Sequence, residues 1–298
     1  MKTLLVAILA LTACFRAGAQ VDLSLAMDQD QFLPNEPIRL AVKITNHSGQ
    51  TLHLGVDPTW LTFSVEAADG FIVMKNTEVP VVEPFDLESS QMATKRVDLQ
   101  PHFVMNKAGR YKVTATMRIP AWSLTVNSTP KHFDIINGAE LWSQNFGVTV
   151  ANNAPPEGRK YTLLEANYLH DHLRLYLEVG SSDGMSVYKV TALGPMVSFS
   201  SPEEQVDQTS QLHVLWQTGA QSFVYATASP NGTILSRDIY DNFNSRPRLG
   251  IDTNGNVRVV GGVRRVPPAE VPTRKLFDVP ETKRVPAQPG TSQPGTGQ

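Results

Sequence analysis

Residues 109–119 read Gly-Arg-Tyr-Lys-Val-Thr-Ala-Thr-Met-Arg-Ile, and this stretch decides the fold class of the 298-residue chain. From Arg110 to Ile119, charged or hydroxyl side chains alternate with apolar side chains at every step. Successive side chains of an extended strand point to opposite faces of a sheet. The period of two therefore predicts a strand with one buried face and one solvated face.

The same alternation recurs in short segments that are separated by turn-forming residues. It is clearest in residues 38–45, 61–66, 173–179 and 212–217, whereas helical spacing extends over no convincing length. Asp-Gly and Asn-Gly pairs between such segments indicate hairpins. We therefore expect an all-β chain with an N-terminal sandwich and a second small antiparallel β-domain.

Composition divides the chain into five parts. Residues 1–19 have the pattern of a signal peptide, 20–150 form the expected sandwich, and 151–159 have a linker's composition. Residues 160–266 form the second β-domain, as a meander or a blade-like unit. Proline recurs throughout 267–298, which buries too little apolar surface to offset the entropy of ordering, so we expect a disordered tail.

The first residues predict export to the periplasm or the exterior of a bacterial cell. A basic start precedes an apolar run, and Ala17-Gly18-Ala19 supplies a small-x-small cleavage pattern. The alternative is a lipoprotein, because residues 11–14 (Leu-Thr-Ala-Cys) resemble a lipobox and would make Cys14 a lipidated N-terminus. We prefer cleavage after Ala19 because the segment before Cys14 is short.

Charge and cysteine content exclude several classes of partner and site. The chain has 26 basic and 28 acidic residues, a net charge of −2, and no long block of one sign. It therefore offers no electrostatic footprint for nucleic acid, and a membrane contact is expected only if Cys14 is lipidated. Cys14 is the only cysteine, so its removal leaves no thiol for catalysis or metal binding, and we expect no cofactor.

Two stretches of residues 21–150 resemble bacterial immunoglobulin-like domains: residues 32–48, with a tight turn before a strand that ends in Asn46-His47-Ser48, and residues 108–113, which match the pattern G-x-Y-x-V. Similar openings occur in a small bacterial proteinase-inhibitor family, which implies a sandwich and, as an alternative function, inhibition. Residues 205–262 resemble propeller blades, but a closed propeller needs at least four blades of about 40–50 residues. A small meander or sandwich is the expectation.

Two short motifs suggest chemistry. Residues 180–184 match G-x-S-x-G around Ser182, but a nucleophile elbow requires a following helix, and the next residues alternate as a strand. His170 and His172 would share one face of a strand and could bind a metal if His213 or Glu178 lay nearby. A hydrolase that uses Ser182 or the His170/His172 pair is therefore the enzymatic alternative.

Three further groups of residues have the composition of binding features. Residues 252–256 superficially resemble a calcium loop, but a hairpin turn on Asn254-Gly255 fits better. A set of aromatic side chains could stack on sugars; Trp216 is expected in the core, whereas Trp60 and Trp122 lie next to turn-like segments and could be exposed. The set comprises Trp60, Trp122, Trp142, Trp216, Tyr225 and Tyr240. Late basic residues could recognise an acidic partner; they are Arg237, Arg246, Arg248, Arg264 and Arg265.

No catalytic constellation emerges from these residues. The leading hypothesis is an exported, non-enzymatic binding or assembly module of the bacterial cell envelope, with a protein or carbohydrate partner. The proteinase inhibitor and the hydrolase are the alternatives.

Overall fold

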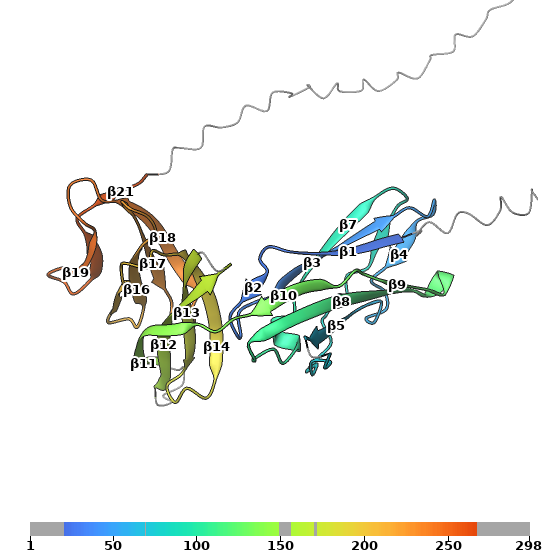
Figure 1. Ribbon diagram of the computed structural model, residues 1–298, viewed down its shortest axis with the longest axis horizontal. Coiled ribbons are helices and arrows are strands. Elements are labelled where there is room, and N and C mark those ends of the chain that lie inside the picture. The colour runs from blue at the N-terminus through green and yellow to red at the C-terminus, as the bar shows by residue number, and fades with distance from the viewer. Residues whose placement is uncertain (1–20, 69, 149–155, 170–171, 267–298) are drawn as a thin grey trace, which may run out of the picture. The chain divides into compact units, whose positions relative to one another are not determined.

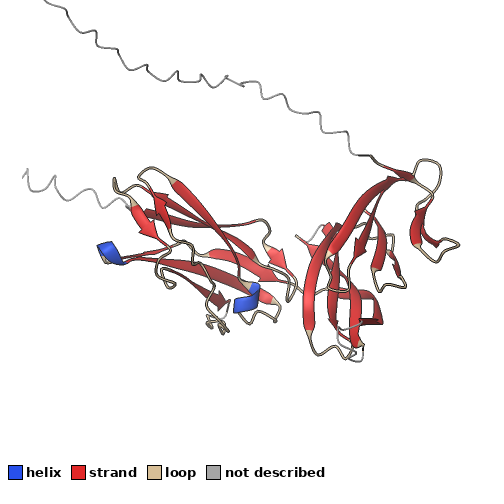
Figure 2. Cartoon of the chain, turned by 180° about the vertical axis from the view of Figure 1, so that it is seen from behind, coloured by secondary structure: helices blue, strands red, loops and turns tan. Residues whose placement is uncertain are grey.

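A computed structural model describes residues 21–68, 70–148, 156–169 and 172–266, which form strands almost throughout (Figures 1 and 2). This confirms the expected all-β chain. Turns and loops separate the strands, and the helical elements of the described part are two short 3-10 turns, η2 (Gln100–His102) and η3 (Pro120–Trp122). No helix within it is long and apolar enough to cross a membrane. The expected signal segment, with Cys14, and the expected tail lie outside the described residues.

The first group of strands forms two main sheets and one short ribbon. One sheet has the order β1-β3-β7, the second has the order β2-β10-β8-β5 with β9 paired to β8, and β4 pairs with β6. β2 runs parallel to β10, and every other described pair is antiparallel. The bounds are β1 (Val21–Met27), β2 (Gln31–Phe32), β3 (Arg39–Asn46), β4 (Leu52–Leu54), β5 (Leu61–Ala67), β6 (Phe85–Leu87), β7 (Met92–Asp98), β8 (Gly109–Ile119), β9 (Leu124–Asn127) and β10 (Lys131–Ile135).

Residues 109–119 form β8, and their predicted alternation of buried and solvated side chains is confirmed. Tyr111, Val113, Ala115, Met117 and Ile119 are all buried, in one core with the inward residues of β3 and β5. The polar residues between them form the other face of the sheet. This core is the main source of stability for the first sandwich, because apolar burial contributes about 25 cal/mol per Å².

The turn before β3 is held by a buried carboxylate. Glu36 accepts hydrogen bonds from the N–H of Leu33 at 2.8 Å and from the side-chain amide of Gln29 at 2.9 Å, while Asn35 adopts a left-handed φ of 62°. Burial raises the pKa of Glu36 above its ordinary value. The Leu-Pro-Asn-Glu sequence is thus a local turn that starts the strand after it.

The second group of strands forms two consecutive meanders. One sheet has the order β11-β12-β13-β14, and the other has the order β15-β16-β17-β18-β21 (Figure 1). A single core, which includes Tyr161, Leu177, Trp216 and Val224, joins inward residues of both sheets. The bounds are β11 (Ala139–Val148), β12 (Glu157–Tyr168), β13 (His172–Ser181), β14 (Val187–Pro195), β15 (Glu203–Val206), β16 (Leu212–Gln217), β17 (Ser222–Ala228), β18 (Ile234–Asp241), β19 (Arg248–Ile251), β20 (Val257–Val260) and β21 (Val263–Arg264).

The strands around the expected linker differ from the sequence prediction. β12 begins at Glu157, so residues 157–159 are strand, and the earlier linker residues 151–155 lie outside the described part. β11 lies before residues 151–155 in the sequence, but the whole of β11 pairs with β12, which follows them. The sequence cue misled because a Pro-rich composition does not show whether the strands before and after it pair with each other.

Candidate functional site

The most connected polar side chains of the second group lie on the outer face of the β15–β18 sheet. All six residues of β16 are buried, so His213 is covered although it points away from the core. Tyr225 on the neighbouring strand β17 shares this outer face, because Leu215 pairs with Tyr225 and side chains alternate along both strands. Asp207 approaches the same imidazole from the turn between β15 and β16.

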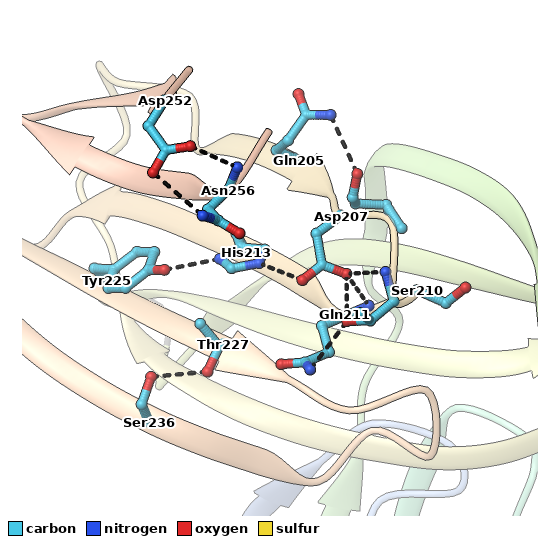
Figure 3. Close-up of polar contacts among 12 residues, drawn as sticks. Gln205, Asp207, Ser210, Gln211, His213, Tyr225, Thr227, Ser236, Asp252 and Asn256 are labelled. Atoms are coloured by element: carbon cyan, nitrogen blue, oxygen red, sulfur yellow. Dashed lines mark hydrogen bonds and ion pairs between the residues drawn. The ribbon is translucent and has the colours of Figure 1, made fainter. Parts of the chain in front are cut away.

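Figure 3 shows a chain of three polar groups in this place. His213 Nδ1 lies 2.7 Å from the hydroxyl of Tyr225, and Nε2 lies 3.2 Å from Oδ2 of Asp207. The other oxygen of Asp207 accepts hydrogen bonds from the N–H of Thr209 at 2.8 Å and of Gln211 at 2.9 Å. In a neutral imidazole one nitrogen donates and the other accepts, so Nε2–H donates to Asp207 and Nδ1 accepts from Tyr225.

The electrostatics of these three hydrogen-bonded groups favour a charged Asp207 and a neutral Tyr225 phenol. Burial acts to raise the pKa of Asp207, but hydrogen bonds from Gln211, Thr209 and His213 outweigh it, and the pKa is lowered. Burial raises the pKa of Tyr225, and negative charge nearby adds to that increase. A raised phenol pKa opposes formation of a phenolate, so the geometry relays a hydrogen bond but does not activate Tyr225 as a nucleophile.

The Asp207 turn belongs to a repeated hairpin design. In both 207–211 and 252–256, an aspartate accepts the N–H groups of the second and fourth residues that follow it. The third residue after each aspartate has a left-handed φ, with Ser210 at 61° and Gly255 at 83°. The calcium-like sequence at Asp252 is therefore a β19–β20 hairpin turn, as expected. The described residues hold no group of three acidic, histidine or cysteine side chains that could bind a metal.

The first sandwich exposes an apolar strip at one edge of its larger sheet. Residues 71–75 return antiparallel to β5, and residues 103–105 bridge to them in turn. Val73, Phe103 and Met105 face the core, so alternate residues face outward. These outward residues are Ile72, Met74 and Val104, which are 77%, 72% and 40% exposed; we call them the apolar strip.

The motifs suggested for catalysis do not come together. Ser182 lies in the exposed turn between β13 and β14, and a strand rather than a helix follows it. His172 begins β13, about 33 Å from Ser182 at the spacing of an extended strand. Glu178 lies six residues further along the same strand, about 20 Å from His172, and both nitrogens of His213 already have partners. His170 lies outside the described residues.

The aromatic residues do not form one surface. Exposure of Trp60, suggested by its place after a turn, is wrong: it is 2% exposed, and its indole N–H donates to the carbonyl of Val81 at 2.6 Å. Trp216 is buried as expected, and Trp122 and Trp142 pack partly against the two cores. Loop 76–84 covers Trp60, and no local pattern near residue 60 reveals that contact.

Most of the late arginines have partners. Arg248 lies 3.6 Å from Glu203, Arg264 pairs with Asp238, and Arg246 donates to the hydroxyl of Ser200. These contacts hold the β19–β20 hairpin and β21 against the rest of the sheet. They represent a salt-bridged face, which is a common arrangement for surface arginines.

Comparison with known proteins places the chain in no family. No family model matches it, and no curated protein matches it. Among solved structures it is similar to the sporulation control protein Spo0M from Bacillus subtilis, at 8% identity and a TM-score of 0.28, over 59% of this chain and 91% of that one. A likeness at this level carries no argument about function.

Proposed function

We propose that this protein is an exported, non-enzymatic binding or assembly module of the bacterial cell envelope. The observation that carries the proposal is the apolar strip of Ile72, Met74 and Val104 at the edge of a sheet. Single exposed apolar residues are ordinary, but neighbouring ones on one face mark an interaction site. The strip favours a protein partner over a carbohydrate, because its side chains are aliphatic and carry no hydrogen-bonding groups.

The proposal includes an immunoglobulin-like first sandwich. The hydroxyl of Tyr111 donates to the carbonyl of Lys107 at 2.7 Å, which has the form of the tyrosine corner of such domains. The tyrosine is the one in the G-x-Y-x-V motif.

Export is supported by the signal-peptide pattern of residues 1–19. The intact mass of the mature protein tests both processing routes. A mass that corresponds to a start at Gln20 supports ordinary cleavage, whereas a diacylglycerol-sized excess on Cys14 supports the lipoprotein.

A double substitution of the strip tests binding. We expect a tagged mature chain to retain a defined partner from its own envelope fraction, and Ile72→Thr with Met74→Thr to abolish retention. Met185→Thr is the matched control, because Met185 is 87% exposed in the turn between β13 and β14, in the second group of strands. Equal retention by the wild type, the double variant and the Met185→Thr control would show that the strip is not the binding surface. Retention of a protease whose activity falls would instead support the inhibitor, and turnover in a broad substrate screen would refute a non-enzymatic function.

A further inference from the structure

β18 is an edge strand whose outer side is paired over only its last two residues. Tyr240 and Asp241 pair with β21, and the described residues provide no partner on that side for residues 234–239. In an antiparallel pair of strands, hydrogen-bonded residue pairs alternate with pairs that are not hydrogen-bonded to each other. The N–H of Asn242 donates to the carbonyl of Gln221, so this pair and every second pair from it along β17 and β18 are hydrogen-bonded. Arg237 falls between such pairs, so its own N–H and C=O point away from β17 and toward the open edge.

The side chain of Arg237 carries a charge that the described residues do not pair. Its guanidinium lies over the ring of Trp216, 5.4 Å from the centroid, and beside Gly194 on β14. Burial lowers the pKa of Arg237, which reflects loss of water around the group. No carboxylate in the described part forms an ion pair with it, in contrast to Arg248 and Arg264.

We propose that the β18 edge binds an extended peptide segment that carries a carboxylate side chain opposite Arg237. Strand addition would supply main-chain hydrogen bonds, and the guanidinium would supply selectivity by pairing with the carboxylate. Leu235 and Ile239 lie two residues before and after Arg237, on the same face of β18, and are 54% and 37% exposed. They favour apolar peptide residues two positions before and after the acid.

Charge argues for an acidic partner over a second copy of the same strand. Antiparallel pairing of two β18 edges around Arg237 would bring two guanidinium groups together, and like charges directly opposite destabilise a sheet. The site lies on a different sheet from the apolar strip, so it does not depend on that proposal.

The test uses a soluble peptide as probe, Lys-Val-Thr-Val-Thr-Glu-Thr-Val-Thr-Val-Lys, with a fluorescent label; the valines two positions before and after the Glu share its face of the strand. We expect saturable binding to the mature chain, and at least tenfold weaker binding when the peptide Glu is replaced by Gln. Arg237→Gln should weaken binding of the Glu peptide at least tenfold, Arg237→Lys should restore part of it, and Arg248→Gln is the matched control. Unchanged melting temperatures confirm that the variants fold.

Five further outcomes would overturn the inference. Equal binding of the Glu and Gln peptides would show that the carboxylate is not recognised. Full binding of a peptide N-methylated at alternate residues would show that the peptide does not bind by strand addition. Binding by a chain that ends at Val266 but not by the full chain would show that residues 267–298 occupy the edge. Absence of binding by both chains, or dimerisation that Arg237→Gln abolishes, would also refute an acidic peptide as the occupant.

Discussion

Replacement of Asp207 by Ala should destabilise the second group of strands by about 2 kcal/mol, because leaving a buried polar group unpaired costs about 1–3 kcal/mol. The substitution removes the acceptor for two backbone N–H groups, for the Thr209 hydroxyl and for His213 Nε2. The N–H groups lie near the surface and regain water. The side chain of His213 is only 9% exposed, so its loss of a partner dominates the cost.

Asp252→Ala is the matched control for this experiment. Asp252 accepts the equivalent two N–H groups in the β19–β20 turn, but it contacts no buried imidazole. We expect a clearly smaller loss for this variant. In thermal unfolding, 2 kcal/mol corresponds to a shift of about 4–8 °C for a domain of 150–250 residues. Equal shifts for the two variants would refute the argument that His213 makes the difference.

The same prediction has a dependence on pH. The folded pKa of Asp207 is lowered, so its contribution is complete above the unfolded pKa of about 3.9 and is lost as the pH falls through the folded pKa. The stability difference between wild type and Asp207→Ala should therefore be constant from pH 7 to 5 and narrow below pH 4. A difference that grows on acidification would contradict a stabilising carboxylate.

Three other predictions follow from the packing, each measured by thermal or urea unfolding. Trp60→Phe should cost about 2–3 kcal/mol, because it leaves a buried carbonyl unpaired and a small cavity; a neutral result would mean that the indole is solvated. Gly232→Ala should cost more than Gly255→Ala, since both have positive φ but the new methyl group would meet a core valine at Gly232 and only a flexible glutamine end at Gly255. Tyr111→Phe should cost about 1 kcal/mol through loss of one hydrogen bond, whereas Tyr188→Phe, at a side chain 50% exposed, should be nearly silent.

The sequence could predict what depends on nearest neighbours along a strand. The alternation in residues 110–119 identified both the strand and its buried face, and Asn254-Gly255 identified a hairpin. Both signals are local, because strand side chains alternate and left-handed turn positions favour glycine or asparagine. The fold class followed from such signals alone.

What the sequence could not predict depends on contacts between distant residues. Trp60 follows a turn, as exposed residues often do, yet it is covered by a loop about 20 residues later. β11 precedes a linker-like segment, yet it belongs to the same sheet as β12 beyond it. The Asp207 network was missed although its turn repeats the pattern at Asp252, because Ser210 occupies the left-handed position in place of the usual glycine.

His213 shows why the best-connected polar group is not the best candidate for chemistry. A general base must present a free nitrogen to the proton it removes, at about 2.6–3.2 Å. Both nitrogens of His213 are occupied, one by the carboxylate of the turn before β16 and one by a phenol whose pKa is raised. The imidazole therefore ties a hairpin turn to the outer face of its sheet. Arg237 is the opposite case, because it is exposed, its guanidinium lies over the ring of Trp216, and the described residues offer it no carboxylate. A charged partner gains most binding free energy where the protein leaves an opposite charge unpaired. The contrast between His213 and Arg237 therefore directs the search for a ligand to the β18 edge.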